Sequence, residues 1–136
     1  MKKKVNIYLF ISLLLISLPN IFCQENTRIQ IDSAGFFEKD DKKFTKATVL
    51  TRDNKNKVKI SHDGVDMWCN QAFFYENRNY IEAYGDVILK QGDTINLNSQ
   101  YLEYNGDTKI AFASGKVKLT EPTSILLTDS LYFDRN

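Results

Sequence analysis

The sequence predicts an all-β protein, a repetitive antiparallel fold whose bent strands form a two-walled trough. Three observations support this prediction. No helical periodicity follows residue 23, short runs alternate between apolar and polar side chains, and a unit of 29 to 30 residues recurs. Alternation with a period of two places every second side chain on the same face of a strand. Each strand can therefore present one apolar face to a core.

Two segments, residues 80–89 and 110–119, show this alternation most clearly, and turn sequences bound them. Gly92-Asp93 and Asn105-Gly106 are turn sequences, and the second is typical of tight hairpins. Pro122 marks a further turn. The segments therefore predict a meander of strands about ten residues long. The residues expected on their inward face are Ile81, Ala83, Gly85, Val87 and Leu89, followed by Ala111, Ala113, Gly115, Val117 and Leu119.

Internal repetition is the more informative pattern. Residues 58–75 align with residues 87–104 without a gap, at a spacing of 29. A third copy, residues 117–133, begins 30 residues after the second and regains the spacing of 29 through one deletion in its turn. Residues 31–37 together with 44–50 are a candidate fourth, degenerate copy. Repetition of this length indicates units that stack on one another and share a continuous core.

Each copy contains a short polar step, at Asn70-Gln71, Ser99-Gln100 and Asp129-Ser130. Leu97 lies before the second step and Leu102 after it, so both face inward only if the alternation slips by one residue. A β-bulge or sharp bend produces that slip and lets a strand pass from one sheet to a facing sheet. A sandwich whose inner residues simply fill the space between its sheets is the alternative that the pattern leaves open.

The recurring apolar positions are the predicted lining of the trough. In the ungapped alignment Trp68 corresponds to Leu97, and Phe73 to Leu102. The full predicted set is Val58, Ile60, Trp68, Phe73, Ile81, Ala83, Val87, Leu89, Ile95, Leu97, Leu102, Tyr104, Ala111, Ala113, Val117, Leu119, Leu131 and Phe133.

The first 23 residues have the pattern of a secretory signal peptide. A basic start, Met1–Lys4, precedes the apolar run Ile7–Leu18, which Pro19 ends. The run is shorter than the roughly 20 residues that a spanning helix needs, so a retained anchor is the less favoured alternative. We therefore expect an exported, periplasmic protein with one domain over residues 24–136. Association of this protein with the outer membrane stays open.

Cys23 raises the alternative of a lipoprotein. A lipidated cysteine requires a small residue before it, and Phe22 stands there, so simple cleavage near Cys23 is favoured. Cleavage leaves 113 of the 136 residues with a net charge of −2, because the leader carries three lysines and no acids. That charge gives no electrostatic reason to bind nucleic acid. Cys69 is then the sole cysteine, which excludes an internal disulfide.

The residue types of catalytic and metal sites are sparse. His62, Asp63, Asp66 and Cys69 form the one metal-like cluster in the sequence, but a strand–turn–strand segment would splay them onto different faces. His62 is the single histidine, so a catalytic triad has no further support, and no glycine-rich phosphate loop is present. The stacked apolar faces also disfavour a β-helix enzyme that acts on polysaccharide. We therefore expect a non-enzymatic protein without a cofactor or metal.

Two segments of the second copy resemble the motifs of a known family. Residues 83–94, A-Y-G-D-V-I-L-K-Q-G-D-T, resemble its A-x-G-N-V-x-I-x-Q-G-D-T core, and residues 102–111 resemble its L-x-Y-D-G-x-T-x-x-A turn. Residues 114–119 with 127–134 resemble the following copy. The family is the OstA-like (organic solvent tolerance) group, which includes the periplasmic lipopolysaccharide-transport bridge protein. The resemblance covers residues 29–134; as a departure, Asn56 stands where later copies have Gly85 and Gly115.

This resemblance implies a V-shaped β-jellyroll whose two sheets enclose an apolar groove for the acyl chains of lipid A. The trough residues given above would then form the lipid-binding groove. The implied role is lipopolysaccharide transport and outer-membrane assembly, with other jellyroll modules joined by edge-strand pairing. The alternative function is a structural or interaction β-solenoid of the cell envelope that transports no lipid. The family includes both short and long members. The alternative that this chain is the front part of a longer protein therefore also stays open.

Overall fold

The computed structural model describes residues 28–39 and 46–135, so the predicted signal peptide and Cys23 lie outside the described residues. The described chain is all-β, as predicted, with one short 3-10 turn, η1, at Glu76–Arg78. The strands are β1 Gln30–Ser33, β2 Phe36–Lys39, β3 Thr48–Thr51, β4 Val58–His62, β5 Val65–Cys69, β6 Gln71–Tyr75, β7 Tyr80–Gln91, β8 Ile95–Asn105, β9 Ile110–Thr120 and β10 Ile125–Asp134.

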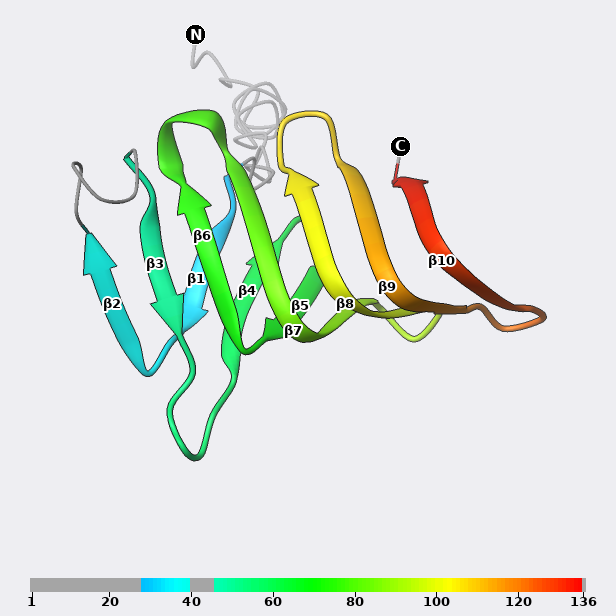
Figure 1. The fold of residues 1–136 in the computed structure, drawn as a ribbon. Helices are drawn as coiled ribbons and strands as arrows, with labels where there is room; N and C mark the ends of the chain where they lie inside the picture. The colour runs from blue at the N-terminus through cyan, green and yellow to red at the C-terminus, as the bar shows by residue number, and fades with distance from the viewer. Residues whose placement is uncertain (1–27, 40–45, 136) are drawn as a thin grey trace, which may run out of the picture.

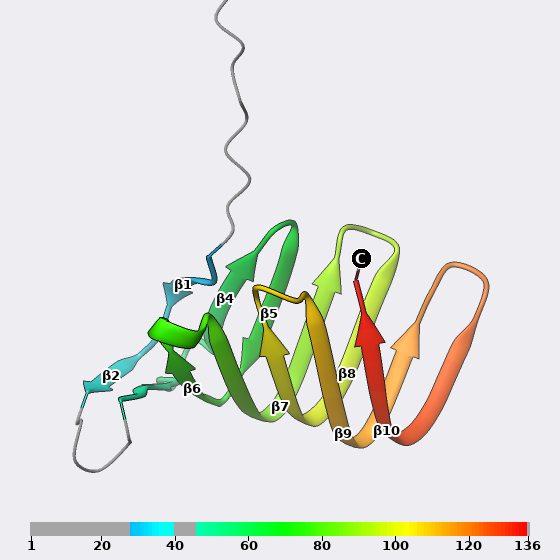
Figure 2. The same ribbon diagram turned by 90° about the horizontal axis from the view of Figure 1, so that it is seen from above.

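The ten strands form one antiparallel sheet that is folded into two walls (Figure 1). Wall A contains β1, β4 and β5, and wall B contains β2, β3 and β6. Strand β7 belongs to both, because its first half pairs with β6 and its second half with β5. Strands β8, β9 and β10 follow in sequence and span both walls in the same way. Figure 2 shows the long strands as V shapes, stacked one behind another.

The long strands bend at β-bulges. The register between β7 and β8 shifts at Gly85-Asp86, and the register between β9 and β10 shifts where Gly115-Lys116 face a single residue. All four of these residues have positive φ, between 44° and 79°. A bulge of this kind inserts one extra residue and sharpens the local bend, so the strand can change walls. The slip predicted at the polar steps is present, with Ser99 and Leu102 both buried on either side of Gln100.

Earlier in the chain the same bend is made by breaks between short strands. Asn70 separates β5 from β6, and its amide donates to the carbonyl oxygens of Tyr84 and Gly85 at 3.1 Å each. The loop 52–57 separates β3 from β4, where the sequence has Asn56 in place of a bulge glycine. There the carboxylate of Asp53 accepts the amides of Lys55 and Asn56 at 2.7 Å, and these bonds lower the pKa of Asp53. The candidate fourth copy begins as β1 and β2, although residues 40–45 lie outside the described part.

The apolar core lies between the two walls. The inward positions of both walls contribute to it, because alternate side chains of every strand point into the V. Its buried members are Ile29, Leu50, Val58, Ile60, Val65, Met67, Cys69, Ala72, Phe74, Ile81, Ala83, Val87, Leu89, Leu97, Leu102, Tyr104, Ala111, Ala113, Val117 and Leu119.

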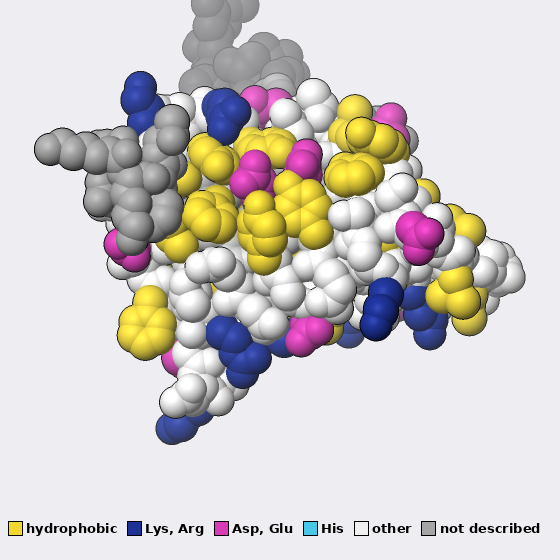
Figure 3. All heavy atoms as spheres, viewed as in Figure 1, with side chains coloured by type: hydrophobic (Ala, Val, Ile, Leu, Met, Phe, Trp, Pro, Cys, Tyr) yellow, Lys and Arg dark blue, Asp and Glu magenta, His cyan; other side chains and the backbone are white. Residues whose placement is uncertain are grey.

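The outer face of wall B carries aromatic side chains around two carboxylates. Figure 3 shows hydrophobic side chains gathered over this wall, with acidic side chains among them. Glu82 and Glu103 lie opposite each other on β7 and β8. The ring centroids of Tyr84 and Tyr101 are 4.9 Å apart, and Tyr101 donates its hydroxyl to Glu103 at 2.6 Å. Burial and this carboxylate raise the pKa of Tyr101. Cross-strand aromatic pairs of this kind stabilise the sheet.

The bulge glycines give a test of this architecture. Replacement of Gly115 by Ala should lower the free energy of unfolding by about 2–3 kcal/mol, because φ is +79° and the new Cβ would lie 2.9 Å from Cβ of Gln100. Gly92 also has positive φ, at +53°, but a Cβ added there would meet no atom within 4 Å. Gly92→Ala should therefore cost only about 1 kcal/mol in urea unfolding. Equal losses for the two variants would argue against close packing at the bend.

Candidate functional site

The space between the walls is the candidate site, and the structure brings most of the predicted groove residues together there. Ile95, Leu131 and Phe133 are partly buried and pack against the core. The predicted residues that lie fully within the core are Val58, Ile60, Ile81, Ala83, Val87, Leu89, Leu97, Leu102, Tyr104, Ala111, Ala113, Val117 and Leu119.

The predicted inward placement of Trp68 and Phe73 is wrong: both lie on the outer face. The cause is a difference in hairpin length. Ile60 pairs with Met67, whereas Leu89 pairs with Leu97, so the second turn contains one more residue than the first. Beyond the first turn, corresponding residues are therefore 30 apart and not 29. An ungapped alignment inverts the faces of both strands that follow that turn, because a slip of one residue exchanges the two faces.

The inward residues that the sequence analysis missed include the neighbours of these two aromatics, in addition to Ile29, Leu50 and Val65. Met67 and Cys69 point inward on β5, and Ala72 and Phe74 do so on β6. The sequence does contain a signal for this register. Asp63-Gly64 is a preferred two-residue hairpin sequence with φ of 45° and 75°, and such a turn places His62 opposite Val65.

The interior is filled by its own side chains through β4, β5, β7 and β8. Leu89 of wall A and Leu102 of wall B are both 0 % exposed, so the inward faces of the two walls cover each other there. At β10 the interior is less covered. Leu126, opposite the inward-facing Leu119, is 44 % exposed, because β10 pairs with β9 alone among the described strands.

Polar contacts join the tips of the two walls and close the open side of the V. We call this set of residues the mouth latch. Arg135 of wall B donates to the backbone oxygen of Asp63 at 2.8 Å and to Gln91 at 3.2 Å, both on wall A. Its side chain is only 3 % exposed. The members of the latch are His62, Asp63 and Gln91 of wall A, with Tyr104, Lys109 and Arg135 of wall B.

Charge and hydrogen bonding reinforce one another in the mouth latch. The hydroxyl of Tyr104 lies 2.7 Å from Nδ1 of His62 and accepts a bond from Arg135 at 2.8 Å. The ammonium of Lys109 lies 2.7 Å from the carboxylate of Asp63 and holds the pKa of that carboxyl below its usual 3.8. A depressed pKa means that this ion pair contributes stability above about pH 4 and loses it as the pH falls through the folded-state pKa.

The metal-like cluster of the sequence does not assemble. Asp66 lies on the outer face beside Lys59, whereas Cys69 is buried inside. Within residues 28–39 and 46–135, His, Cys, Asp and Glu side chains form no group of three that could hold a metal ion. The same described residues contain no helix with the length and hydrophobicity that a membrane span requires.

Comparison with known proteins gives the family. A family model described as OstA-like protein matches residues 26–136, nearly the whole chain. The chain belongs to the OstA-like protein family. The match begins just after the predicted signal peptide and covers every described strand. No curated protein matches the sequence. Family membership connects the protein with transport in the cell envelope, and the resemblance predicted from the repeat motifs is confirmed.

The mouth latch of this OstA-like protein predicts that replacement of Arg135 strongly lowers the stability of the fold. Arg135→Met should lower the free energy of unfolding by about 1–3 kcal/mol, because it leaves the partly buried hydrogen-bond acceptors of the guanidinium without a partner. Lys118→Met, on an exposed position of β9, should change it by no more than about 0.5 kcal/mol. Urea unfolding followed by circular dichroism measures both values. A loss for Arg135→Met no greater than that for the control would contradict the latch.

Cys69 gives a second prediction. Burial raises the pKa of its thiol to about 12, so almost no reactive thiolate is present in the folded protein at neutral pH. In protein from which residues 1–23 have been removed, iodoacetamide should therefore label Cys69 only after unfolding in urea. Mass spectrometry of the alkylated protein distinguishes the two states, and rapid labelling under native conditions would show that the walls separate readily.

Proposed function

We propose that this OstA-like protein is a non-enzymatic, lipid-binding module of lipopolysaccharide transport and outer-membrane assembly. In this proposal it acts in the periplasm after loss of residues 1–23 and shields acyl chains between its two walls. Family membership supports the transport role. The apolar character of the inward faces supports a greasy ligand and offers little to a covalent reaction.

The observation that carries the proposal is the incompletely covered interior at β10. Leu126 is 44 % exposed, and Leu131 and Phe133 are only partly buried, although these inward positions correspond to fully buried ones in the preceding strands. Each acyl methylene that leaves water contributes about 0.8 kcal/mol. About ten methylenes laid along these residues would therefore contribute several kcal/mol after the cost of ordering the chain.

The filled part of the interior restricts where a lipid first binds. An acyl chain cannot lie against Leu89 and Leu97 unless the walls move apart, because these neighbouring side chains of wall A are 0 % and 1 % exposed. The mouth latch opposes that movement. The proposal therefore places the first acyl contact at β10, with deeper binding dependent on separation of the walls.

Strand β10 also supports the proposed partners. It pairs with β9 alone among the described strands, so the backbone groups on its other side are available to a further strand. Addition of a strand from another jellyroll module would extend both walls and cover the apolar end. The proposed partners are such modules of the inner- and outer-membrane transport components, together with lipid A acyl chains.

A structural or interaction module that carries no lipid is the second candidate. The tight packing of Val87, Leu89 and Leu97 favours it, because a β-solenoid needs its interior only for its own core. The two candidates differ in whether lipid contacts the inward side of β10.

Site-specific photocrosslinking separates them. The full chain is expressed in a host that makes lipopolysaccharide, with a photoreactive amino acid in place of Leu131 or of Tyr132. These neighbours share one strand, but Leu131 faces the interior, whereas Tyr132 is 77 % exposed on the outer face. We expect a lipopolysaccharide adduct from position 131, at least about fivefold stronger than from position 132.

A third position reports on the deeper interior. A photoreactive residue at Leu97 should give little adduct in the wild-type background and more when Arg135→Met weakens the mouth latch. Equal adducts at positions 131 and 132, or none at either, would reject the lipid-binding proposal and favour the structural module.

A further inference from the structure

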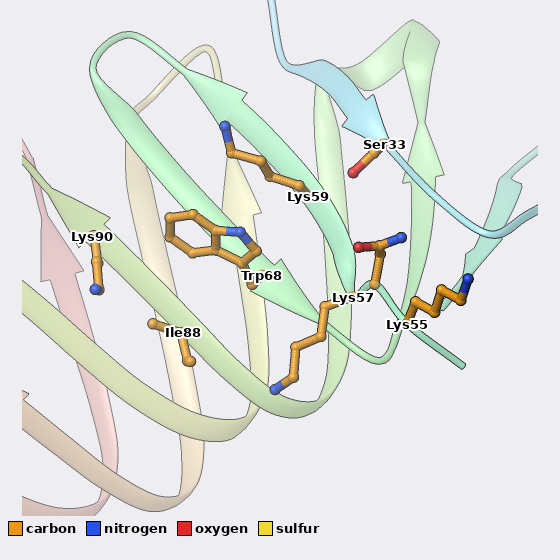
Figure 4. Close-up of a pocket in the computed structure, with 8 residues that line it drawn as sticks. Ser33, Lys55, Lys57, Lys59, Trp68, Ile88 and Lys90 are labelled. Atoms are coloured by element: carbon orange, nitrogen blue, oxygen red, sulfur yellow. The ribbon is translucent and has the colours of Figure 1, made fainter. Parts of the chain in front are cut away.

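A concave site lies on the outer face of wall A, on the opposite side of the sheet from the candidate groove. Its volume is about 530 Å³, within the range of pockets that hold small ligands. Figure 4 shows Trp68 of β5 at its centre, with Ile88 of β7 below the indole and lysine side chains around it. The lining consists of Ser33, Lys55, Asn56, Lys57, Lys59, Trp68, Ile88 and Lys90.

Cross-strand register assembles this site. Ser33, Lys59, Trp68 and Ile88 occupy directly paired positions on β1, β4, β5 and β7. Their side chains therefore project from one face in a continuous row. Lys90 follows Ile88 by two residues on β7, so it shares that face as well. The loop 52–57 adds Lys55 from the side (Figure 4).

The site is basic, and its acidic neighbours lie outside the lining. The carboxylates of Asp32 and Asp66 lie 3.1 Å and 3.6 Å from Nζ of Lys59, and these ion pairs hold that side chain at the rim of the site. Lys57 donates to the backbone oxygen of Asp86 at 2.8 Å.

Two further lysines of the lining are not held in an ion pair, although Asp66 of β5 stands directly opposite Lys90 of β7. Lys55 and Lys90 form no ion pair with any described residue, and no carboxylate belongs to the lining. The carboxylate of Asp86 accepts a hydrogen bond from the side chain of Gln100, and hydrogen bonds from Gln100 and Asn70 lower its pKa. Asp86 is therefore a negatively charged neighbour of Lys57.

Trp68 supplies an aromatic surface between two ammonium groups. Nζ of Lys59 lies 5.8 Å from its ring centroid, and Nζ of Lys90 lies 5.9 Å away. An indole face suits the C–H faces of a sugar ring, whereas ammonium groups donate charge-assisted hydrogen bonds to phosphate or carboxylate oxygens. Lysines, unlike arginines, act as point charges and accept anions in varied orientations.

We propose that the Trp68 site binds an anionic saccharide, a sugar unit that carries a phosphate or carboxylate group. The sugar ring lies against the indole and Ile88, and the anionic group lies beside the lysine ammonium groups that surround them, with Nζ of Lys90 5.9 Å from the indole centroid. This binding is distinct from the acyl-chain function proposed above, because Met67 and Cys69, the neighbours of Trp68, face the interior instead. The same chemistry occurs in the head group of a glycolipid and in a free anionic glycan.

Trp68 is the single tryptophan of the chain, so its emission reports on this site when it is excited at the long-wavelength edge, where the seven tyrosines do not absorb. Protein purified after expression of the full chain is titrated with N-acetylglucosamine 1-phosphate and, separately, with neutral N-acetylglucosamine. We expect a saturable change in emission with the phosphorylated sugar, and at least about tenfold weaker binding of the neutral sugar. An increase from about 50 to 500 mM NaCl should weaken the binding several-fold. Equal affinity for both sugars, or no saturable change, would overturn the proposal.

Matched variants identify the responsible side chains. Lys90→Met should raise the Kd about threefold, and the double variant with Lys55→Met about tenfold, as expected for partly exposed charge contacts. Lys118→Met, in the same outer row of wall A but on β9, should leave the Kd unchanged. A Kd that rises equally in the Lys118 variant would show non-specific attraction by a basic face and would also overturn the proposal.

Two further titrations separate the sources of the saccharide. Binding to phosphatidylcholine vesicles that contain lipid A, but not to phosphatidylcholine alone, supports a glycolipid head group. Binding of the free sugar phosphate without any response to those vesicles supports a free glycan.

Tighter binding of single-stranded DNA than of either saccharide probe would overturn the assignment. Repetition with Leu131→Ser keeps the Trp68 site separate from the acyl-chain proposal, since this variant should leave sugar binding unchanged.

Discussion

The fold depends on one constraint: each long strand, from β7 to β10, must change walls at the same level without moving its apolar side chains out of the interior. The bulges at Gly85-Asp86 and Gly115-Lys116 resolve this, because two residues of one strand face one residue of the next. The close approach of Gln100 to Gly115 explains why a residue without a side chain stands there. The wedge shape follows from the repetition of this bend along the whole sheet.

The bend divides the protein into surfaces of different chemistry. Inward positions are mostly apolar, with His62 and Ser99 as buried polar members, whereas the outer face of wall B gathers tyrosines around Glu82 and Glu103. The outer face of wall A gathers lysines around Trp68. One strand contributes to several of these surfaces, as β7 does with Leu89 inside, Glu82 outside wall B and Lys90 outside wall A. A one-residue change in register therefore exchanges whole surfaces, which makes turn length a determinant of function as well as of packing.

Turn length also sets the limit of what the sequence predicts. The long strands, the repeat and the slip near Gln100 follow from alternation alone, because local periodicity determines them. Trp68 and Phe73 were placed on the wrong face because the alignment assumed equal turns, although the Asp63-Gly64 hairpin is one residue shorter than the turn after Gln91. The mouth latch could not be predicted in this way. Its members His62, Tyr104 and Arg135 are far apart in sequence and meet only because two walls converge, a long-range geometry that no local pattern encodes.

The relation between the latch and the core shapes any transport role. The tips of the walls are held by Arg135 and Lys109, while the fold line is held by backbone hydrogen bonds at Asn70. Of these two margins, the tips offer the easier opening, because they are joined by side chains and not by a continuous backbone ladder. At β10 the apolar interior is already less covered. A ligand that binds at this end and extends inward would replace contacts between apolar side chains by contacts with acyl chains of similar apolar character. The main free-energy cost of separating the walls would then be the loss of the polar contacts of the mouth latch. The strength of that latch, more than the apolar area of the interior, then decides how far an acyl chain penetrates.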